Sequence, residues 1–121
     1  MTDKKKILIC DDEVVIRESL KLILGEIYDL SFCTNGKECL DIITQGRSFN
    51  LILLDIKMPI ANGLDTLRKI KKNNTQHKVI IVTGYRSFDT AQEAIKAGAL
   101  DYIVKPFDSK NVLESVARNI K

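Results

Sequence analysis

Short runs of apolar residues alternate along the chain with segments in which apolar residues recur every three or four positions. The first pattern is typical of buried strands, and the second is typical of helices that cover a core with one face. The predicted strands are residues 6–10, 30–33, 51–54, 79–82 and 101–104. The predicted helices are residues 13–24, 36–43, 64–72, 88–97 and 109–120.

The third and fourth predicted strands are apolar throughout, as central parallel strands covered on both faces are. Five strand–helix pairs joined by right-handed crossovers predict an α/β fold. We expect a single doubly wound (βα)5 domain, with a five-stranded parallel sheet of order 2-1-3-4-5 and helices on both faces. The domain is expected to occupy residues 1–121, with its core at about 5–120.

Residues at helix ends and on helix faces give finer predictions. Asp12 is expected to cap the first helix, Asp108 or Ser109 to cap the last, and Gly98 to end the fourth. The positions expected to face inward on the last two helices are Ala91, Ala94, Ile95, Val112, Leu113, Val116, Ala117 and Ile120.

Composition narrows the class of protein. A chain of 121 residues with 45% hydrophobic and 29% charged residues is typical of one soluble globular domain. The net charge of +3 is spread along the chain, with Lys4-Lys5-Lys6 as its densest point and no Trp, so direct nucleic-acid binding is not expected. No C-x-x-C pair, apolar leader or membrane-length run is present. We therefore expect a cytoplasmic protein without membrane contact, whose three cysteines are buried thiols.

Polar residues follow the predicted strands at the points where chemistry would be expected. Asp11 and Asp12 follow the first strand, Asp55 the third, Thr83 the fourth and Lys105 the fifth. Ligands of open α/β sheets bind beyond the carboxyl ends of the strands, where the strand order reverses. In the order 2-1-3-4-5, the acidic pair and Asp55 would converge at that point.

Such a cluster predicts phosphoryl chemistry. Three neighbouring carboxylates repel one another, so either their pKa values rise or a cation lies among them, and all-oxygen ligands favour Mg²⁺ as that cation. One carboxylate could then attack phosphorus and form an acyl phosphate, while Lys105 and Thr83 would supply an ammonium and a hydroxyl to the phosphoryl oxygens. If the Lys105–Pro106 bond is cis, the lysine would be aimed inward.

These motifs together resemble the receiver domain of two-component response regulators over essentially the whole chain. Any one motif is weak, but their order and spacing are highly specific. The motifs are Asp11-Asp12-Glu13, Asp55 followed by Lys57-Met58-Pro59 and Asn62-Gly63, Thr83-Gly84, Ala97-Gly98-Ala99 and Lys105-Pro106-Phe107.

The resemblance implies a switch rather than a stand-alone enzyme. Asp55 would become a 4-aspartylphosphate by taking a phosphoryl group from a phosphohistidine of a sensor kinase or phosphotransfer protein. Asp12, Asp55 and the carbonyl of Lys57 would bind Mg²⁺, with Asp11 assisting through water, while Thr83 and Lys105 would bind the phosphoryl group.

The resemblance also implies how the signal leaves the site. Tyr102 would turn inward as Thr83 moves towards the phosphate, remodelling the face of the fourth helix, fifth strand and fifth helix. That face would bind a downstream protein, a fused output domain or a second copy of the chain. Lys57, beside the site, would affect how long the phosphate survives.

Three alternatives use the same features differently. An aspartate-nucleophile phosphatase of the haloacid dehalogenase type would need D-x-D after the first strand, where this chain has adjacent acids. A flavodoxin-type module would need a hydroxyl- and glycine-rich loop there. A receiver that binds partners without phosphorylation would not need the intact set of Asp55, Thr83 and Lys105.

Overall fold

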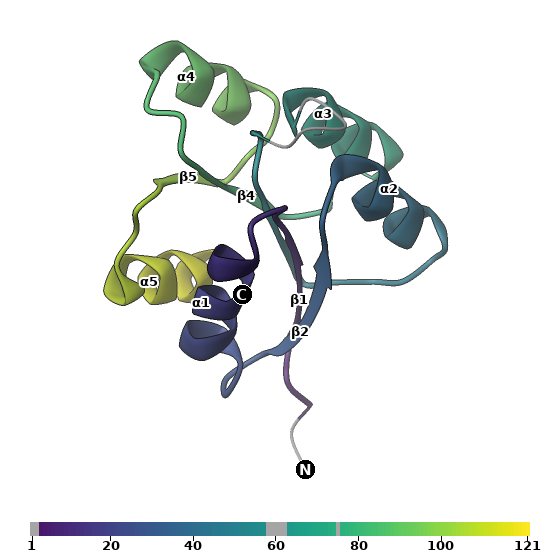
Figure 1. The fold of residues 1–121 in the computed structure, drawn as a ribbon. Helices are drawn as coiled ribbons and strands as arrows, with labels where there is room; N and C mark the ends of the chain where they lie inside the picture. The colour runs from purple at the N-terminus through teal and green to yellow at the C-terminus, as the bar shows by residue number, and fades with distance from the viewer. Residues whose placement is uncertain (1–2, 58–62, 75) are drawn as a thin grey trace.

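Five parallel strands form the centre of the molecule, in the order β2-β1-β3-β4-β5 (Figure 1). The computed structural model describes residues 3–57, 63–74 and 76–121. The strands are β1 (Lys6–Cys10), β2 (Asp29–Cys33), β3 (Leu51–Leu54), β4 (Val79–Thr83) and β5 (Asp101–Val104). The helices are α1 (Val14–Leu24), α2 (Gly36–Thr44), α3 (Gly63–Asn73), α4 (Phe88–Lys96) and α5 (Ser109–Asn119). The predicted fold class and strand order are confirmed.

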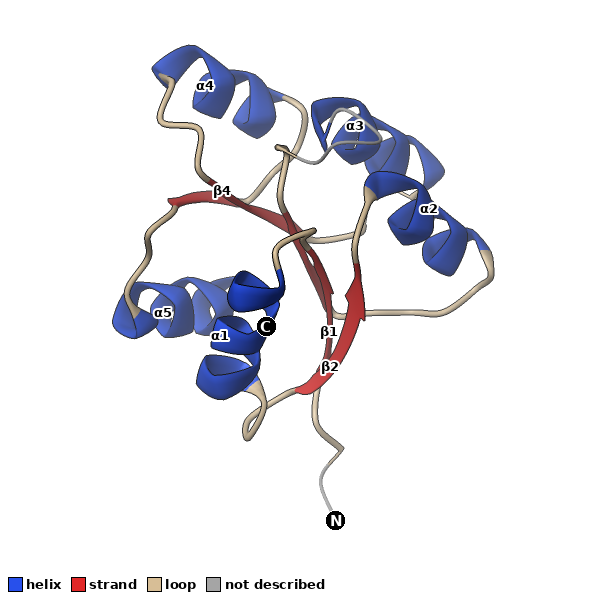
Figure 2. Ribbon diagram, viewed as in Figure 1, coloured by secondary structure: helices blue, strands red, loops and turns tan. Residues whose placement is uncertain are grey.

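The helices form two layers on opposite faces of the sheet, as Figure 2 shows. On one face, α1 and α5 pack Leu20, Leu24 and Val116 against the sheet. On the other face, α2 and α3 contribute Cys39 and Leu67 to the second core. Strands β1, β3 and β4 are covered on both sides, which explains why their sequences are almost continuously apolar.

The first helix begins one residue later than predicted, and Asp12 is not its cap. Glu13 occupies the N-cap position in extended geometry and, within the described part of the chain, makes no side-chain cap hydrogen bond. The cause is the preceding turn, in which Asp11 Oδ1 accepts a hydrogen bond from the Glu13 amide at 2.9 Å. Asp12 therefore stays outside the helix, while the predicted cap by Asp108 and helix end at Gly98 are confirmed.

Two positions predicted to face inward do not. Ile95 is exposed beside the buried Ala94, and Ala117 is exposed beside the buried Val116. Ala94 and Val116 are turned towards the sheet, and the next residue lies about 100° further round each helix, on its outer side. In α4 the small Ala94 takes the inward position, which leaves Ile95 and Phe88 on the outer surface.

Gly63 fixes the approach of α3 to the end of β3. A Cβ atom at this position would lie 2.1 Å from the Cα of Ile56, so only glycine fits. Its amide also donates to the Ile56 carbonyl at 3.2 Å. None of the helices in the described ranges is long and apolar enough to cross a membrane.

Candidate functional site

One ammonium group meets three carboxylates at the carboxyl edge of the sheet. The Nζ atom of Lys105 lies 2.8 Å from Asp11 Oδ2 and 2.9 Å from Asp55 Oδ2. The same atom lies 3.1 Å from Glu13 Oε1. The four residues follow β1, β3 and β5, so the predicted convergence of the strand ends occurs.

Backbone hydrogen bonds hold this edge in register one residue beyond each strand. The amide of Asp55 donates to the Cys10 carbonyl at 3.0 Å, and the amide of Lys105 donates to the Thr83 carbonyl at 2.8 Å. On the other side, the amide of Asp11 donates to the Cys33 carbonyl at 3.1 Å. The side chains of Asp11, Asp55 and Lys105 are thus fixed by the sheet itself rather than by a loose loop.

Asp55 is buried, with 2% of its surface exposed, yet both of its carboxylate oxygens are bonded. Oδ2 faces Lys105, and Oδ1 accepts a hydrogen bond from the Lys57 amide at 2.8 Å. A buried carboxylate is stable in its charged form only with such partners. These two bonds therefore fix the orientation of the Asp55 carboxylate.

The acidic cluster has the donor set of a hard cation. One carboxylate oxygen from each of Asp11, Asp12, Glu13 and Asp55 lies within 4.8 Å of the other three. Asp11 and Asp55 are buried, whereas Asp12 and Glu13 are exposed, so the cluster opens to solvent on one side. Oxygen ligands of this number and kind fit Mg²⁺.

Burial and neighbouring charges shift the pKa values of Asp11 and Lys105. Burial raises the pKa of Asp11 above its usual value, although Lys105 and the Glu13 amide oppose that change. Burial acts to lower the pKa of Lys105, but Asp11 and Asp55 outweigh it, so the pKa of Lys105 is raised. Lys105 is consequently a permanent cation, and the two buried acids are the groups that compensate it.

Thr83 ends β4 at the same edge and is fully buried. Its hydroxyl oxygen accepts a hydrogen bond from the Tyr85 amide at 3.4 Å. The Lys105–Pro106 bond is cis, and Lys105 points at the carboxylates as predicted for that geometry. Of the motif residues, Met58, Pro59 and Asn62 lie outside the described residues.

Two residues not selected from the sequence belong to this region. Glu13 completes the group around Lys105, and the only signal for it was a third acid directly after Asp11-Asp12. Tyr85 links two of the predicted residues, because the ammonium of Lys57 lies 5.4 Å from the centre of its ring. Its carbonyl oxygen also accepts a hydrogen bond from the Tyr102 hydroxyl at 2.9 Å.

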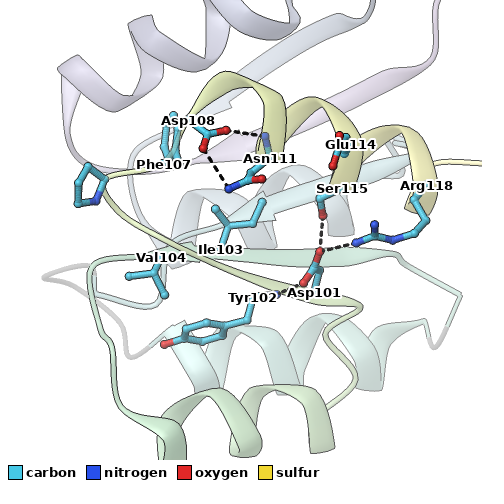
Figure 3. A pocket seen from close by; sticks show the side chains of 11 residues that line it. Asp101, Tyr102, Ile103, Val104, Phe107, Asp108, Asn111, Glu114, Ser115 and Arg118 are labelled. Carbon is cyan, nitrogen blue, oxygen red and sulfur yellow. Dashed lines mark hydrogen bonds and ion pairs between the residues drawn. The ribbon is translucent and has the colours of Figure 1, made fainter.

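Tyr102 lies between the acidic edge and the outer face of the domain. Burial and the negative charge of Asp55 raise the pKa of its phenol. In Figure 3 its ring points away from α5, on the other side of β5 from Ile103. The preceding residue, Asp101, accepts hydrogen bonds from the side chains of Ser115 at 2.6 Å and Arg118 at 3.0 Å (Figure 3). These bonds connect β5 to α5.

Comparison with known proteins gives one family over most of the chain. The family model of the response regulator receiver domain matches residues 7–117. The chain is 38% identical over 119 residues to Response regulator protein PilR of Pseudomonas aeruginosa, covering 98% of this chain but 26% of that protein. It is 37% identical over 115 residues to Sporulation initiation phosphotransferase F of Bacillus subtilis, covering 94% of this chain and 92% of that protein.

Solved structures give the same result. A response regulator receiver domain protein (CheY-like) from Methanospirillum hungatei JF-1 superimposes with a TM-score of 0.91 at 37% identity. The match covers 98% of this chain and 94% of that one. The chain thus spans about a quarter of the length of PilR and nearly the whole of the two shorter proteins.

Proposed function

This chain belongs to the response regulator receiver domain family of two-component systems, and on that premise we propose that Asp55 accepts a phosphoryl group in a Mg²⁺-dependent reaction. The observation that carries the proposal is the state of Asp55. It is a buried carboxylate held by Lys105 on one oxygen and by the Lys57 amide on the other. Receiver domains are signalling switches rather than enzymes, and we propose that this one catalyses only its own phosphorylation and dephosphorylation.

The transfer we propose is a displacement at phosphorus. An Asp55 carboxylate oxygen forms the new O–P bond as the P–N bond to a phosphohistidine breaks, and the imidazole leaves with that electron pair. Asp11, Asp12, Asp55 and the carbonyl of Lys57 would hold the Mg²⁺, which when bound supplies positive charge to the phosphoryl oxygens.

The residues around Asp55 prepare it for that reaction. Lys105 is already in contact with an Asp55 oxygen, so its ammonium can follow the charge onto the phosphoryl group without a large movement. Thr83 would donate its hydroxyl to a phosphoryl oxygen. Its present bond from the Tyr85 amide is long, at 3.4 Å, and costs little to give up.

We propose that Tyr102 carries the change outward. The hydrogen bond from its hydroxyl to the Tyr85 carbonyl joins Tyr102 to the loop that follows Thr83. A movement of Thr83 would therefore displace this loop and Tyr102 with it. The face formed by α4, β5 and α5 would then change its contacts. Its exposed Phe88 and Ile95 offer apolar surface there to a downstream protein, an output domain or a second copy of the chain.

The partners and the extent of the unit belong to the same proposal. The donor would be a sensor histidine kinase or a histidine phosphotransfer protein in the cytoplasm. The receiver unit would occupy residues 1–121, with its core at about 5–120, which contains the matched residues 7–117. A receiver that works without phosphorylation is the alternative, and the complete group around Asp55 is what disfavours it.

The test is chemical labelling. The protein is incubated with acetyl phosphate and Mg²⁺, and its intact mass is measured with and without a chelator. We expect one added phosphoryl group that is lost in Asp55→Asn and retained in Asp41→Asn, an exposed aspartate on α2 that serves as the matched control. Labelling that survives Asp55→Asn, or that needs no divalent cation, would contradict the proposal. Repeated turnover of a phosphate ester would instead indicate a phosphatase.

A further inference from the structure

Three cysteine side chains from different elements meet in the core beneath α2. Cys10 ends β1, Cys33 ends β2 and Cys39 lies in α2. Their sulfur atoms all lie within 4.8 Å of one another, and none of the three residues is more than 3% exposed. All three are reduced thiols.

The fold holds these thiols in place. Cys10 and Cys33 are register partners on neighbouring parallel strands, so their side chains leave the sheet on the same face. The Cys10 thiol donates to the carbonyl of Asn35 at 3.2 Å, and Asn35 is the N-cap of α2. Glu38 completes that cap by accepting a hydrogen bond from the Thr34 amide at 2.8 Å. Cys39 is thereby fixed above the pair.

We propose that Cys10, Cys33 and Cys39 form a binding site for a trivalent, thiophilic ion of the arsenite class. For three sulfurs spaced this closely, a point exists within about 2.8 Å of all of them, near the roughly 2.3 Å of a metal–thiolate bond. Small side-chain rotations would bring three sulfurs to bonding distance. The site is distinct from the acidic cluster, and it does not depend on the role proposed for Asp55.

The coordination number and the charge select the ion. Structural zinc sites use four ligands, and among the described residues no histidine or carboxylate joins the three sulfurs. Zn²⁺ with three thiolates would also leave one net negative charge. The surroundings are apolar, including Leu8, Ile43 and Ile52, and an unpaired charge there is costly.

A trivalent ion avoids both difficulties. Arsenous acid forms three As–S bonds with three thiols and loses its three hydroxyl groups with the thiol protons as three waters, so no atom changes oxidation state. The product is neutral and three-coordinate, which suits a buried apolar site. Hydrogen bonds from Cys10 and Cys33 lower the pKa of Cys39 despite its burial.

The experiment uses the whole chain, reduced with a phosphine, and arsenite as the probe. Bound arsenic is measured by elemental analysis after dialysis, and the thermal unfolding midpoint is followed as arsenite is added. We expect one arsenic per chain and a rising midpoint, because the ion binds the folded site. The variants Cys10→Ala, Cys33→Ala and Cys39→Ala should each lose affinity by tenfold or more. Their folding is checked by circular dichroism.

The controls make the inference falsifiable even where a variant does not fold. One result needs only the native protein. A thermal unfolding midpoint that falls as arsenite is added would mean that arsenite binds the thiols of the unfolded chain, and it would contradict the site. Failure of the folded protein to retain arsenic would overturn the site. Equal retention by the three variants, or Zn²⁺ bound as tightly as arsenite, would do the same. Labelling of Asp55 is measured in parallel, so failure of this site is distinguishable from failure of the phosphoacceptor.

Discussion

The hydroxyl of Tyr102 donates a hydrogen bond to the carbonyl oxygen of Tyr85 across the space between β5 and the loop after β4, at 2.9 Å. This bond joins the residue proposed to carry the signal to the segment that follows Thr83. Tyr85 is in turn covered by the ammonium of Lys57, two residues after Asp55. The proposed phosphoacceptor and the outer face are therefore linked by a short series of contacts.

Tyr102→Phe should disfavour the present position of the ring, in which it is half-buried and packs against the core. The substitution removes a hydrogen bond worth about 1 kcal/mol to this half-buried position, which is about a fivefold change in the equilibrium between ring positions. Because phosphorylation and the inward state favour each other, labelling by acetyl phosphate should become slower by up to about that factor. Tyr28→Phe, on a half-buried tyrosine away from the site, is the control. An unchanged labelling rate would show that this bond does not contribute to the switch.

Lys57→Ala should shorten the lifetime of the phosphorylated state. The Lys57 side chain lies over Tyr85 at the exposed side of the site, and its removal would open a path for water to the acyl phosphate. Dephosphorylation is followed by intact mass after removal of the phosphodonor. Lys57→Arg, which keeps the cation–ring contact, should preserve the lifetime, and Lys37→Ala on α2 serves as a remote control. Equal rates in the native protein and Lys57→Ala would remove Lys57 from the mechanism.

Lys105→Met should destabilise the domain through the acids it leaves behind. The Lys105 side chain is 10% exposed and faces Asp11 and Asp55, which would become buried charges without this cation beside them. Removal of one member of a buried ion pair costs about 3 to 5 kcal/mol, so the free energy of unfolding in urea should fall by that order. Added Mg²⁺ should recover part of this loss, because it occupies the same carboxylates. A variant as stable as the native protein without Mg²⁺ would show that the acids do not need Lys105.

Much of this arrangement follows from the sequence, for identifiable reasons. The apolar runs before Asp11, Asp55 and Thr83 must be strands, and parallel strands bring their carboxyl ends to one edge. The inward direction of Lys105 was predicted only on the condition that the Lys105–Pro106 bond is cis, and the bond is cis. Such predictions depend on the order of elements and not on the rotation of any single helix.

The incorrect or missing predictions depend on finer geometry. Ile95 was assigned to the core because its apolar character fits either side of α4, and only the closeness of Ala94 to the sheet decides the rotation. The contact of Glu13 with Lys105 depends on the turn made by Asp11. The meeting of Cys10, Cys33 and Cys39 requires the strand register and the tilt of α2 together, so spacing along the chain does not reveal it.

Glu38→Gln should remove an acid-sensitive contribution to stability from α2. Hydrogen bonds from the Thr34 hydroxyl and amide lower the pKa of Glu38 below its usual 4.5. Because the folded pKa is the lower one, the unfolded chain binds more protons between the two values, and stability rises with pH across that window. The contribution is therefore complete above about pH 4.5 and is lost as the pH falls through the folded pKa. Urea unfolding of the native protein and Glu38→Gln should differ at pH 7 and converge as the pH falls below 4.5 and through the folded pKa of Glu38, because both side chains are uncharged below it. Glu114→Gln, at an exposed position on α5, is the matched control. A difference between native protein and Glu38→Gln that stays constant from pH 7 to pH 3 would mean that Glu38 supports α2 through packing and not through its charged cap.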